Sequence, residues 1–439
     1  MVRRKRLPLI VAGVAALAAA ATVAIQANAA TRVTSASLSP SYGPVSVETA
    51  GTTYKYRSMP ALQYITWTNS TGTHKRFIRS FQITRDDGTL NTVIQYHTGG
   101  SMTDRTHWKE ALDTSGRRLL STTPYAKVNN TFKSGNATVT MDEMARKDSA
   151  GRFIARRSSS DGGVHWSNSR APLDMAGGAI HPCARGRAFQ RVIRLPDNTL
   201  VMPFYAVHKA NATRCADITR TWSAAHLLIS RDEGKHWRRA STVFKSTTNT
   251  YSESTVARRS DHKLIMISRY DVVSGNKQYA KLAYRVTKAP VDNAYGLLHA
   301  SWGPWTAVKV PGAADYPNTA QGSAPVLHQM DGGKLMLVFG RPRNKVAFSS
   351  NGGANWSTAH SFYDNIPTSG CGSGYRLSDG TYFPCSSLGS SGYLGVAVTS
   401  PRTAYVIGDN CHTNWGCAGS YAYPHGTTYR LWYSTIRLS

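Results

Sequence analysis

The most informative stretch of this sequence reads Ser159-Ser160-Asp161-Gly162-Gly163-Val164-His165-Trp166, because its pattern S-x-D-x-G-x-x-W occurs three times. The second copy is SRDEGKHW at residues 230–237, and the third is SSNGGANW at residues 349–356, with Asn in the place of Asp. Asp and Ser side chains can bond the amides of a turn, the central Gly can adopt a positive φ, and Trp can pack beneath the turn. Each copy therefore predicts a rigid corner between two β-strands.

A second repeated feature lies between these boxes: an apolar run, a short turn of Asp, Gly or Asn, and another apolar run. One example places residues 192–195 and 200–202 on either side of Asp197-Asn198, and another places 255–257 and 264–267 around Asp261-His262. Hairpins that recur at intervals of about fifty to seventy residues are typical of propeller blades with about four strands each. Beyond the N-terminal segment, no stretch carries a sustained apolar stripe of helical period. The sequence therefore predicts an all-β fold.

The first 29 residues have the features of a secretory signal peptide. Four basic residues at positions 3–6 precede an apolar run at 7–25, and Ala27-Asn28-Ala29 forms a cleavage site of small residues. The alternative is an uncleaved membrane anchor, since the apolar run is long enough to span a bilayer. We expect cleavage and secretion into the extracellular medium, and no membrane association afterwards.

The composition excludes a disordered chain, because 41% of the residues are hydrophobic and only 17% are charged. The formal net charge is +28, and removal of the four basic residues of the signal leaves +24. Lys and Arg are scattered, with no basic helix and no recognition motif, so nucleic acid is the least favoured partner. A basic soluble surface, or attraction to anionic glycans, fits this charge better.

Six cysteines follow the signal, and an even number in an exported chain favours disulfides. Sequence neighbours suggest the pairs Cys183–Cys215, Cys371–Cys385 and Cys411–Cys417, among fifteen possible arrangements. No two cysteines have C-x2-C spacing and no two histidines have ligand spacing, so we expect no metal site.

The three boxes and the hairpins between them resemble those of the sialidase family, whose members carry Asp-box (BNR) repeats. The resemblance implies a six-bladed β-propeller over residues 70–439, joined by an N-terminal segment at 30–69. It also implies that the boxes lie at blade corners, away from the active site.

The resemblance further implies a set of catalytic groups. A sialidase binds a sugar with a carboxylate on its anomeric carbon, and arginine pairs with carboxylate in a bidentate fork. A Tyr nucleophile avoids the repulsion that a second carboxylate would cause, provided that a nearby carboxylate takes its proton. A separate acid must protonate the leaving oxygen.

Matching the family pattern to this sequence gives three arginines for the substrate carboxylate. Arg79 comes before the first hairpin turn, with Arg76 as a competitor. Arg269 ends the strand that follows Glu253. Arg341 closes the hairpin before the third box, and Arg343 is the alternative to it.

The same matching gives three catalytic residues. Asp148, which precedes the first box, is the expected acid/base, although the long stretch 99–147 also offers Asp104 and Asp142. Glu253 is the expected base, and its spacing from Arg269 across one hairpin lets both side chains point toward the centre. Tyr393, followed by a complete hairpin, is the expected nucleophile, with Tyr375 as a distant second.

Taken together, these features predict a secreted, monomeric, exo-sialidase-like glycoside hydrolase that retains configuration and uses no cofactor. Its expected partner is a glycan that ends in a sialic acid or a related nonulosonic acid. An extra Cys-bounded hairpin at residues 364–390 leaves the choice among such acids open. The rival interpretations are another exo-glycosidase on the same propeller, such as an exo-arabinanase acting on a neutral sugar, and a glycan-binding propeller without catalysis.

Overall fold

We describe a computed structural model of the chain. The described residues are 38–44, 46–48, 57–84, 90–121, 126–175, 186–208, 222–274, 277–313, 322–340, 344–362, 375–376, 382–383, 392–409 and 431–439. Ser39–Ser439 forms one compact unit. The expected signal peptide and all six cysteines lie outside the described residues. No helix within the described parts of the chain is long and apolar enough to cross a membrane.

The described chain is built almost entirely of β-strands, and antiparallel pairing dominates. The first sheet contains β3 (Arg57–Asn69), β4 (Gly72–Thr84), β5 (Leu90–His97), β6 (Trp108–Glu110) and β8 (Leu120–Ser121). A ten-stranded sheet contains β7 (Leu112–Asp113), β9 (Asn130–Ser134), β10 (Ala137–Asp148), β11 (Gly151–Ser159), β12 (His165–Asp174), β13 (Gly186–Ala188), β14 (Ile193–Arg194), β15 (Leu200–His208), β16 (Trp222–Ser230) and β17 (Trp237–Ser246).

Two four-stranded sheets follow: β18 (Thr250–Arg258), β19 (Leu264–Ser274), β20 (Lys277–Val286) and β21 (Thr306–Ala307), and then β22 (Ser323–Gln329), β23 (Leu335–Gly340), β24 (Lys345–Ser349) and β25 (His360–Ser361). The last large sheet joins β28 (Gly395–Ser400), β29 (Thr403–Asp409) and β30 (Leu431–Leu438) to β1 (Pro40–Tyr42) and β2 (Ser46–Val47). The remaining elements are the pair β26 (Tyr375–Arg376) and β27 (Tyr382–Phe383), the short helix α1 (Ala294–Leu298), and 3₁₀ turns at Arg105–His107 and Asp331–Gly333.

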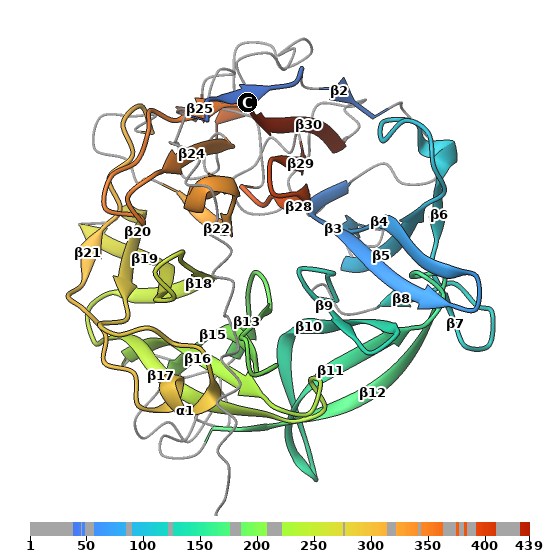
Figure 1. Ribbon diagram of the computed structural model, residues 1–439, viewed down its shortest axis with the longest axis horizontal. Coiled ribbons are helices and arrows are strands. Elements are labelled where there is room, and N and C mark those ends of the chain that lie inside the picture. The colour runs from blue at the N-terminus through green and yellow to red at the C-terminus, as the bar shows by residue number, and fades with distance from the viewer. Residues whose placement is uncertain are drawn as a thin grey trace, which may run out of the picture. The chain divides into compact units, whose positions relative to one another are not determined.

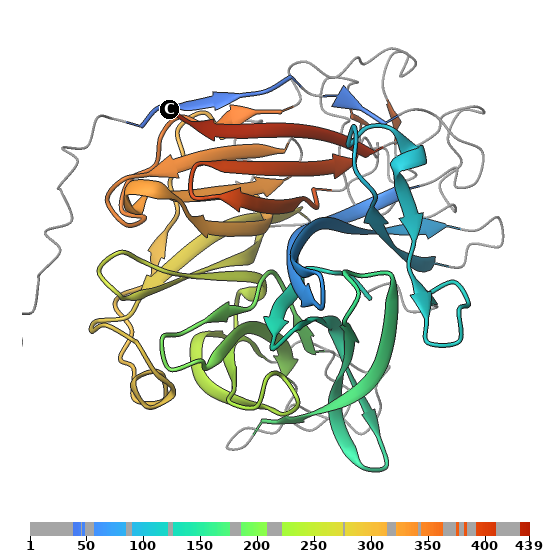
Figure 2. The same ribbon diagram turned by 45° about the vertical axis from the view of Figure 1, so that its right-hand side comes forward.

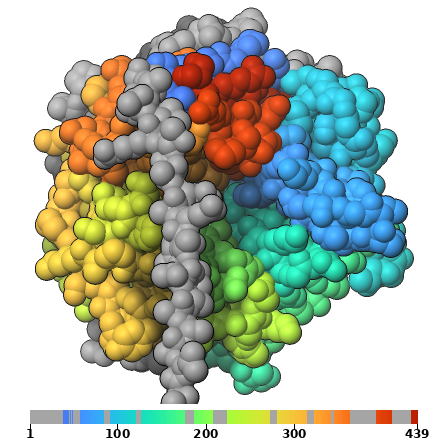
Figure 3. Space-filling view, viewed as in Figure 1, coloured from blue at the N-terminus to red at the C-terminus, as the bar shows by residue number. Residues whose placement is uncertain are grey.

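The sheets follow one another in chain order around a common centre (Figure 1). The inner strands make the ring continuous, because β18 contacts β15 and β22, β22 contacts β28, β28 contacts β3, and β3 contacts β9 and β10. The same order is visible on the surface in Figure 3, where the colours pass from blue through green and yellow to red. The predicted all-β, propeller-like fold is therefore confirmed.

The number of blades is a separate question. Two consecutive four-strand groups are hydrogen-bonded into the ten-stranded sheet, through the pair Met144 and Arg187 and through the parallel pairing of β12 with β17. The sheets thus do not divide into six separate units by pairing alone, and the count of six remains a prediction.

The N-terminal part of the described chain contributes strands to two sheets. β1 pairs with the C-terminal strand β30, and the two lie side by side in Figure 2. β3 is already a full partner of β4, so the sheets begin well before the expected boundary at residue 70. The described part of 30–69 therefore contributes β3 to the first sheet and the short strands β1 and β2 to the last one.

The boxes form the corners that their residues predicted, at the turns β11–β12, β16–β17 and β24–β25. In the first copy, Ser159 Oγ accepts from Gly163 N at 2.8 Å, and Asp161 Oδ1 accepts from His165 N at 3.0 Å. The second and third copies repeat these bonds, with Asn351 Oδ1 in the place of the carboxylate. Trp166 is fully buried beneath its turn, and Trp237 nearly so. The prediction of three rigid corners is confirmed.

Candidate active site

Glu253 is the centre of a buried polar cluster at the end of the sheets away from the boxes. It lies four residues into β18, and β17 leads from the second box to the opposite end of its sheet before β18 begins. Its carboxylate accepts from the Tyr393 hydroxyl, from Arg269 Nη1 at 3.2 Å, and from Ala324 N at 2.8 Å. Only 3% of Glu253 is exposed, so these partners replace water around its charge.

Arg269 reaches Glu253 from the neighbouring strand β19. Its Nε also donates to Asp271 Oδ1 at 2.9 Å, so one guanidinium bridges two carboxylates. Burial would lower the pKa of Arg269, but Glu253 and Asp271 outweigh burial and raise it above the ordinary value. Arg269 is therefore a permanent cation whose charge is balanced inside the protein.

Tyr393 comes from a distant part of the chain, just before β28. Its ring packs edge-on against Phe189, with centroids 5.9 Å apart and planes at 68°. Lys127 Nζ lies over the ring, 4.5 Å from the centroid. Tyr393 is 5% exposed, and its hydroxyl is directed at Glu253.

A second buried carboxylate, Glu143, lies on the other side of Lys127. Its Oε2 accepts from Arg187 Nη2 at 2.7 Å, its Oε1 accepts from Asn129 Nδ2, and Lys127 Nζ is 3.9 Å from Oε1. Glu143 is fully buried in β10, close to the register shift between Met141 and Ala145. The cluster thus has two carboxylates: Glu253 accepts from Tyr393, and Glu143 faces Lys127.

The charges of this cluster affect one another. Burial lowers the pKa of Lys127, whereas Glu143 and Glu253 raise it and Arg187 lowers it further. Burial raises the pKa of Tyr205. Arg187 lowers this pKa, and the same two glutamates raise it. All these groups therefore lie within electrostatic range of one centre.

Asp148, the expected acid/base, is not brought to this cluster. It lies at the exposed turn between β10 and β11, where Arg170 Nη2 donates to its carboxylate at 2.9 Å. It is five residues beyond Glu143 along an extended strand, a separation of about 16 Å at the rise of a β-strand. The structure therefore places Glu143, and not Asp148, against Lys127, whose Nζ lies over the Tyr393 ring.

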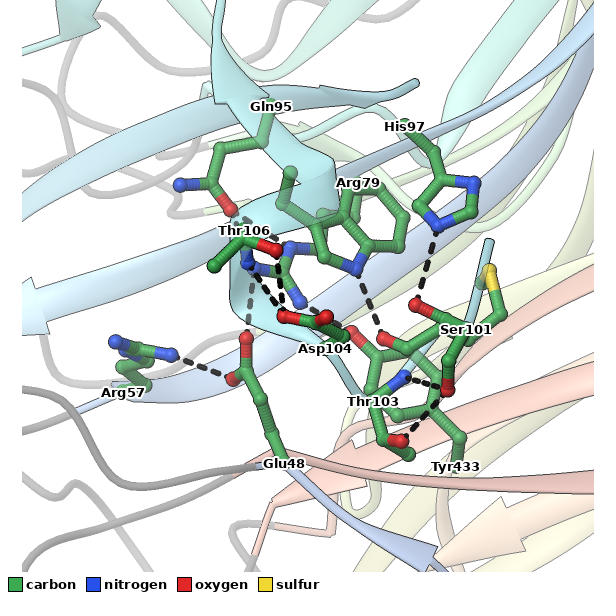
Figure 4. A network of polar contacts seen from close by, with 12 residues as sticks. Glu48, Arg57, Arg79, Gln95, His97, Ser101, Thr103, Asp104, Thr106 and Tyr433 are labelled. Atoms are coloured by element: carbon green, nitrogen blue, oxygen red, sulfur yellow. Dashed lines mark hydrogen bonds and ion pairs between the residues drawn. The ribbon is translucent and has the colours of Figure 1, made fainter. Parts of the chain in front are cut away.

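Arg79 is also placed elsewhere, in a buried network between the first and last sheets (Figure 4). Its guanidinium donates to Glu48 Oε1 at 3.0 Å, to Gln95 Oε1 at 2.8 Å and to the Tyr433 hydroxyl, and it lies 4.0 Å from the Trp108 ring centroid. Arg79 is 1% exposed. Neighbouring β4 residues alternate between the two faces of the sheet, and Arg79 projects from the face that packs on β30.

The alternatives named from the sequence are placed as follows. Arg76 Nη1 donates to Gly162 O at 3.1 Å and so supports the first box. Asp142 is bonded to Arg157 and Arg146, and Asp104 caps a 3₁₀ turn. Arg341, Arg343 and the side chain of Tyr375 lie outside the described residues. Of the six expected site residues, the structure brings together Glu253, Arg269 and Tyr393.

Sequence reasoning missed Glu143, Lys127 and Arg187. Glu143 lies in a run of charged residues that ends at Asp148, which suggests solvent exposure. The strand bulge that turns Glu143 inward has no signature in the sequence. Lys127 precedes the short strand β9, where a lone lysine suggests solvent exposure.

Among the described residues, no group of three or more His, Cys, Asp or Glu could hold a metal ion.

The fold and the three corners define an all-β protein of the Asp-box type. The BNR repeat-like domain model matches residues 137–425, so the chain belongs to the BNR repeat-like domain family. A search of the curated protein sequences finds no significant relative.

Solved structures with a similar fold share little sequence with this chain. A protein of unknown function from Dyadobacter fermentans aligns with a TM-score of 0.55 and 11% identity, over 91% of this chain and 99% of its own. An α-L-arabinanase from Penicillium chrysogenum, complexed with arabinobiose, gives 0.50 and 11%, over 91% and 98%. The K499G mutant of the NanB sialidase from Streptococcus pneumoniae gives 0.47 and 10%, over 91% and 71%. These similarities concern the fold alone.

Proposed function

We propose that the protein is a secreted, retaining exo-glycoside hydrolase that releases a terminal sialic acid or related nonulosonic acid. The observation that carries the proposal is the hydrogen bond from the buried Tyr393 hydroxyl to Glu253. A phenol with an ordinary pKa of about 10 is a weak nucleophile at neutral pH unless a base accepts its proton during attack. Arg269 and Ala324 N donate to Glu253 Oε2, which leaves Oε1 to accept the Tyr393 proton.

The proposed reaction has two displacements. In the first, the Tyr393 proton passes to Glu253, the phenolic oxygen bonds to the anomeric carbon, and the glycosidic C–O bond breaks with its electron pair on the leaving oxygen. An acid must protonate that oxygen, and water then displaces Tyr393 in the second step, with overall retention. Asp148 remains the candidate acid only if the β10–β11 turn moves toward the cluster.

Buried groups without hydrogen-bond partners support a ligand with several hydroxyls. Lys127 Nζ and Asn129 Oδ1 are buried beside Glu143, and each lacks a hydrogen-bond partner among the described residues. Unsatisfied buried polar atoms are uncommon in native proteins and call for an explanation. A sugar would supply donors and acceptors to such atoms.

A second candidate is a glycosidase acting on a neutral sugar, such as an arabinofuranoside. Two observations favour it: Arg79 is paired with Glu48 in another network, and Glu143 is a second buried carboxylate, facing the Lys127 side chain that lies over Tyr393. Retaining enzymes for neutral sugars use two carboxylates, one of them as the nucleophile. Glu143, which accepts from Arg187 and Asn129, would attack, and Glu253 would serve as acid and base.

A hydrolysis assay with the purified protein separates these candidates. Its substrates are the aryl glycosides of sialic acid, of its deaminated relative and of α-L-arabinofuranose. The sialidase proposal expects release of the acidic sugar, with loss of turnover in Tyr393→Phe. The neutral-sugar candidate expects release of arabinose, with the greater loss in Glu143→Gln. If the folded protein binds these glycosides but hydrolyses none of them, it is a glycan-binding propeller and both proposals fail.

A further inference from the structure

Lys127 is a fully buried ammonium that the mechanism above does not use. Its Nζ has no hydrogen-bond acceptor among the described residues. Its Nζ lies 4.5 Å from the centroid of the Tyr393 ring and 3.9 Å from Glu143 Oε1. Burying a cation without hydrogen bonds is unfavourable, so its surroundings must compensate for the lost hydration.

The charged groups facing Lys127 come from four strands around the ring. Glu143 of β10, Glu253 of β18 and Asp409 of β29 each raise its pKa, and Arg187 of β13 opposes them. Burial acts in the direction of Arg187 and is the largest single effect. Burial prevails, so the pKa of Lys127 lies below its ordinary value, and the ion pair with Glu143 Oε1 at 3.9 Å is the contact that favours the ammonium form.

The position of the ammonium over the ring face gives it a specific effect on Tyr393. A cation within about 6 Å of a ring centroid is attracted by the negative face of the π-system. Loss of the phenolic proton adds negative charge to the oxygen and the ring, so the same cation stabilises the phenolate more than the phenol. An interaction that strengthens as charge develops accelerates the step in which it develops.

We propose that Lys127 is a positioning residue that stabilises negative charge on Tyr393 as the hydroxyl proton passes to Glu253. In this step the Tyr393 O–H bond breaks, its electron pair stays on the phenolic oxygen, and the proton bonds to Glu253 Oε1. The inference rests on the proposed function for the role of Tyr393 in catalysis. The charge coupling between Lys127 and Tyr393 follows from the geometry alone and can be measured without turnover.

The direct test replaces Tyr393 with a ring-fluorinated tyrosine, which ionises at lower pH and whose ¹⁹F resonance reports that ionisation. Lys127→Met removes the charge and keeps an unbranched side chain of similar length. We expect the midpoint of the ¹⁹F titration to rise by about one pH unit or more in this variant. Lys127→Arg should stay near the parent protein. Lys109→Met, which removes an exposed lysine of β6, is the matched control and should leave the midpoint unchanged.

A kinetic arm separates this inference from the proposed function. Lys127→Met should lower kcat in the parent protein and have little further effect in Tyr393→Phe, because the two side chains act in one step. A raised midpoint in a protein that hydrolyses no glycoside would uphold the coupling and refute the proposed function. An unchanged midpoint in Lys127→Met overturns the inference even if the enzyme is active. If Lys127→Met does not fold, Lys127→Gln replaces it, with the same criteria.

Discussion

Glu253 accepts one hydrogen bond that supports the backbone, from Ala324 N, and one that serves the proposed reaction, from the Tyr393 hydroxyl. It accepts from the backbone N–H of Ala324, a non-glycine residue with a φ of 47°. Asp409 makes the corresponding bond with Met59 N, at 2.7 Å, and Met59 has a φ of 51°. In both places a buried carboxylate supports a left-handed residue at the register shift of an inner strand. A buried acid at this position therefore has a structural reason, and Tyr393 adds the chemistry.

The pair of Tyr393 and Glu253 gives the first prediction. Tyr393→Phe removes one hydroxyl, and Glu253→Gln keeps an acceptor for Ala324 N while losing the base. We expect each to lower kcat by about 10²–10⁴-fold, the usual contribution of proton transfer to a positioned side chain. The double variant should be little worse than either single one, because both residues serve the same step.

Steady-state kinetics on the glycoside that proves to be the substrate tests this pair. Each variant must melt near the parent protein for its kinetics to count. Normal turnover by folded Tyr393→Phe would remove this residue from the mechanism and direct attention to Glu143.

Arg79 gives a prediction about stability. It shares Glu48 with Arg57, and all three side chains are buried. Removing one partner of a buried ion pair leaves charge uncompensated, which costs about 3–5 kcal/mol. We expect Arg79→Met to lower the free energy of unfolding by this amount in urea titrations and to leave KM unchanged in the folded protein. A large rise in KM without loss of stability would instead support a role in the substrate clamp.

At the scale of single elements, the boxes stabilise three strand corners with nearly identical hydrogen bonds. Their packing partners differ, however. The first box is covered by Trp67 and held by Arg76, which itself stacks over the Trp67 ring at 4.9 Å. A Cβ added to Gly162 would lie 2.7 Å from that ring. This corner therefore depends on the first sheet as well as on its own turn.

Gly162 and Gly116 form a matched pair for testing this dependence. Both have a positive φ, 74° and 77°, but a Cβ at Gly116 would meet nothing within 4 Å. Gly116→Ala should cost about 1–2 kcal/mol from the backbone conformation alone. Gly162→Ala should cost about 1–3 kcal/mol more, because Trp67 must move.

Chemical unfolding of both glycine variants measures the difference, and hydrolysis should be unchanged in each, since the boxes lie at the far end of the sheets from Glu253. If Gly162→Ala and Gly116→Ala lower the free energy of unfolding equally, Trp67 moves aside without an energetic penalty. Loss of activity in a folded Gly162→Ala would contradict the separation of box and site.

At the scale of the whole described chain, contacts across the centre tie together sheets that are not neighbours. Arg191, with a φ of 75°, donates from Nη1 to His328 Nδ1 at 2.6 Å and joins the ten-stranded sheet to β22. The adjacent Gln190 Nε2 donates to Leu394 O at 3.2 Å, next to Tyr393. This two-residue bridge fixes the strands that carry the cluster.

His328 makes the bridge sensitive to acid. Burial, assisted by Arg191, holds the pKa of His328 well below its ordinary value. The unfolded chain therefore binds a proton at this residue first as the pH falls. The stabilisation from neutral His328 is complete above the ordinary histidine pKa of about 6.5 and is lost progressively below it.

We expect His328→Gln, which keeps an acceptor for Arg191 but cannot titrate, to lose less stability than the parent protein between pH 7 and pH 5. Urea unfolding at several pH values measures this difference directly. The other histidines are common to both proteins and cancel in the comparison. If the free energies of unfolding of the two proteins change in parallel with pH, protonation of His328 does not affect the stability that the bridge provides.

The all-β class, the three corners and the pairing of Glu253 with Arg269 are properties of the sequence by itself. Each depends on residues within one turn or one hairpin, where side-chain chemistry and the two-residue period of a strand act directly. The same local logic could not place Tyr393, which reaches Glu253 from 140 residues away.

Only the tertiary structure decided which charged residues share the site. Register shifts in β10 and β18 change the face on which later residues lie, and strict alternation gives no sign of them. Glu143 lies within the shift of β10 and is buried, whereas Asp148 stays at a turn. Pairing with distant strands likewise decides that Lys127 is buried before β9 and that Arg79 lies between two sheets. The physical reason is that a β-sheet fixes its contacts through pairing with distant strands, and one displaced residue redirects every side chain that follows it.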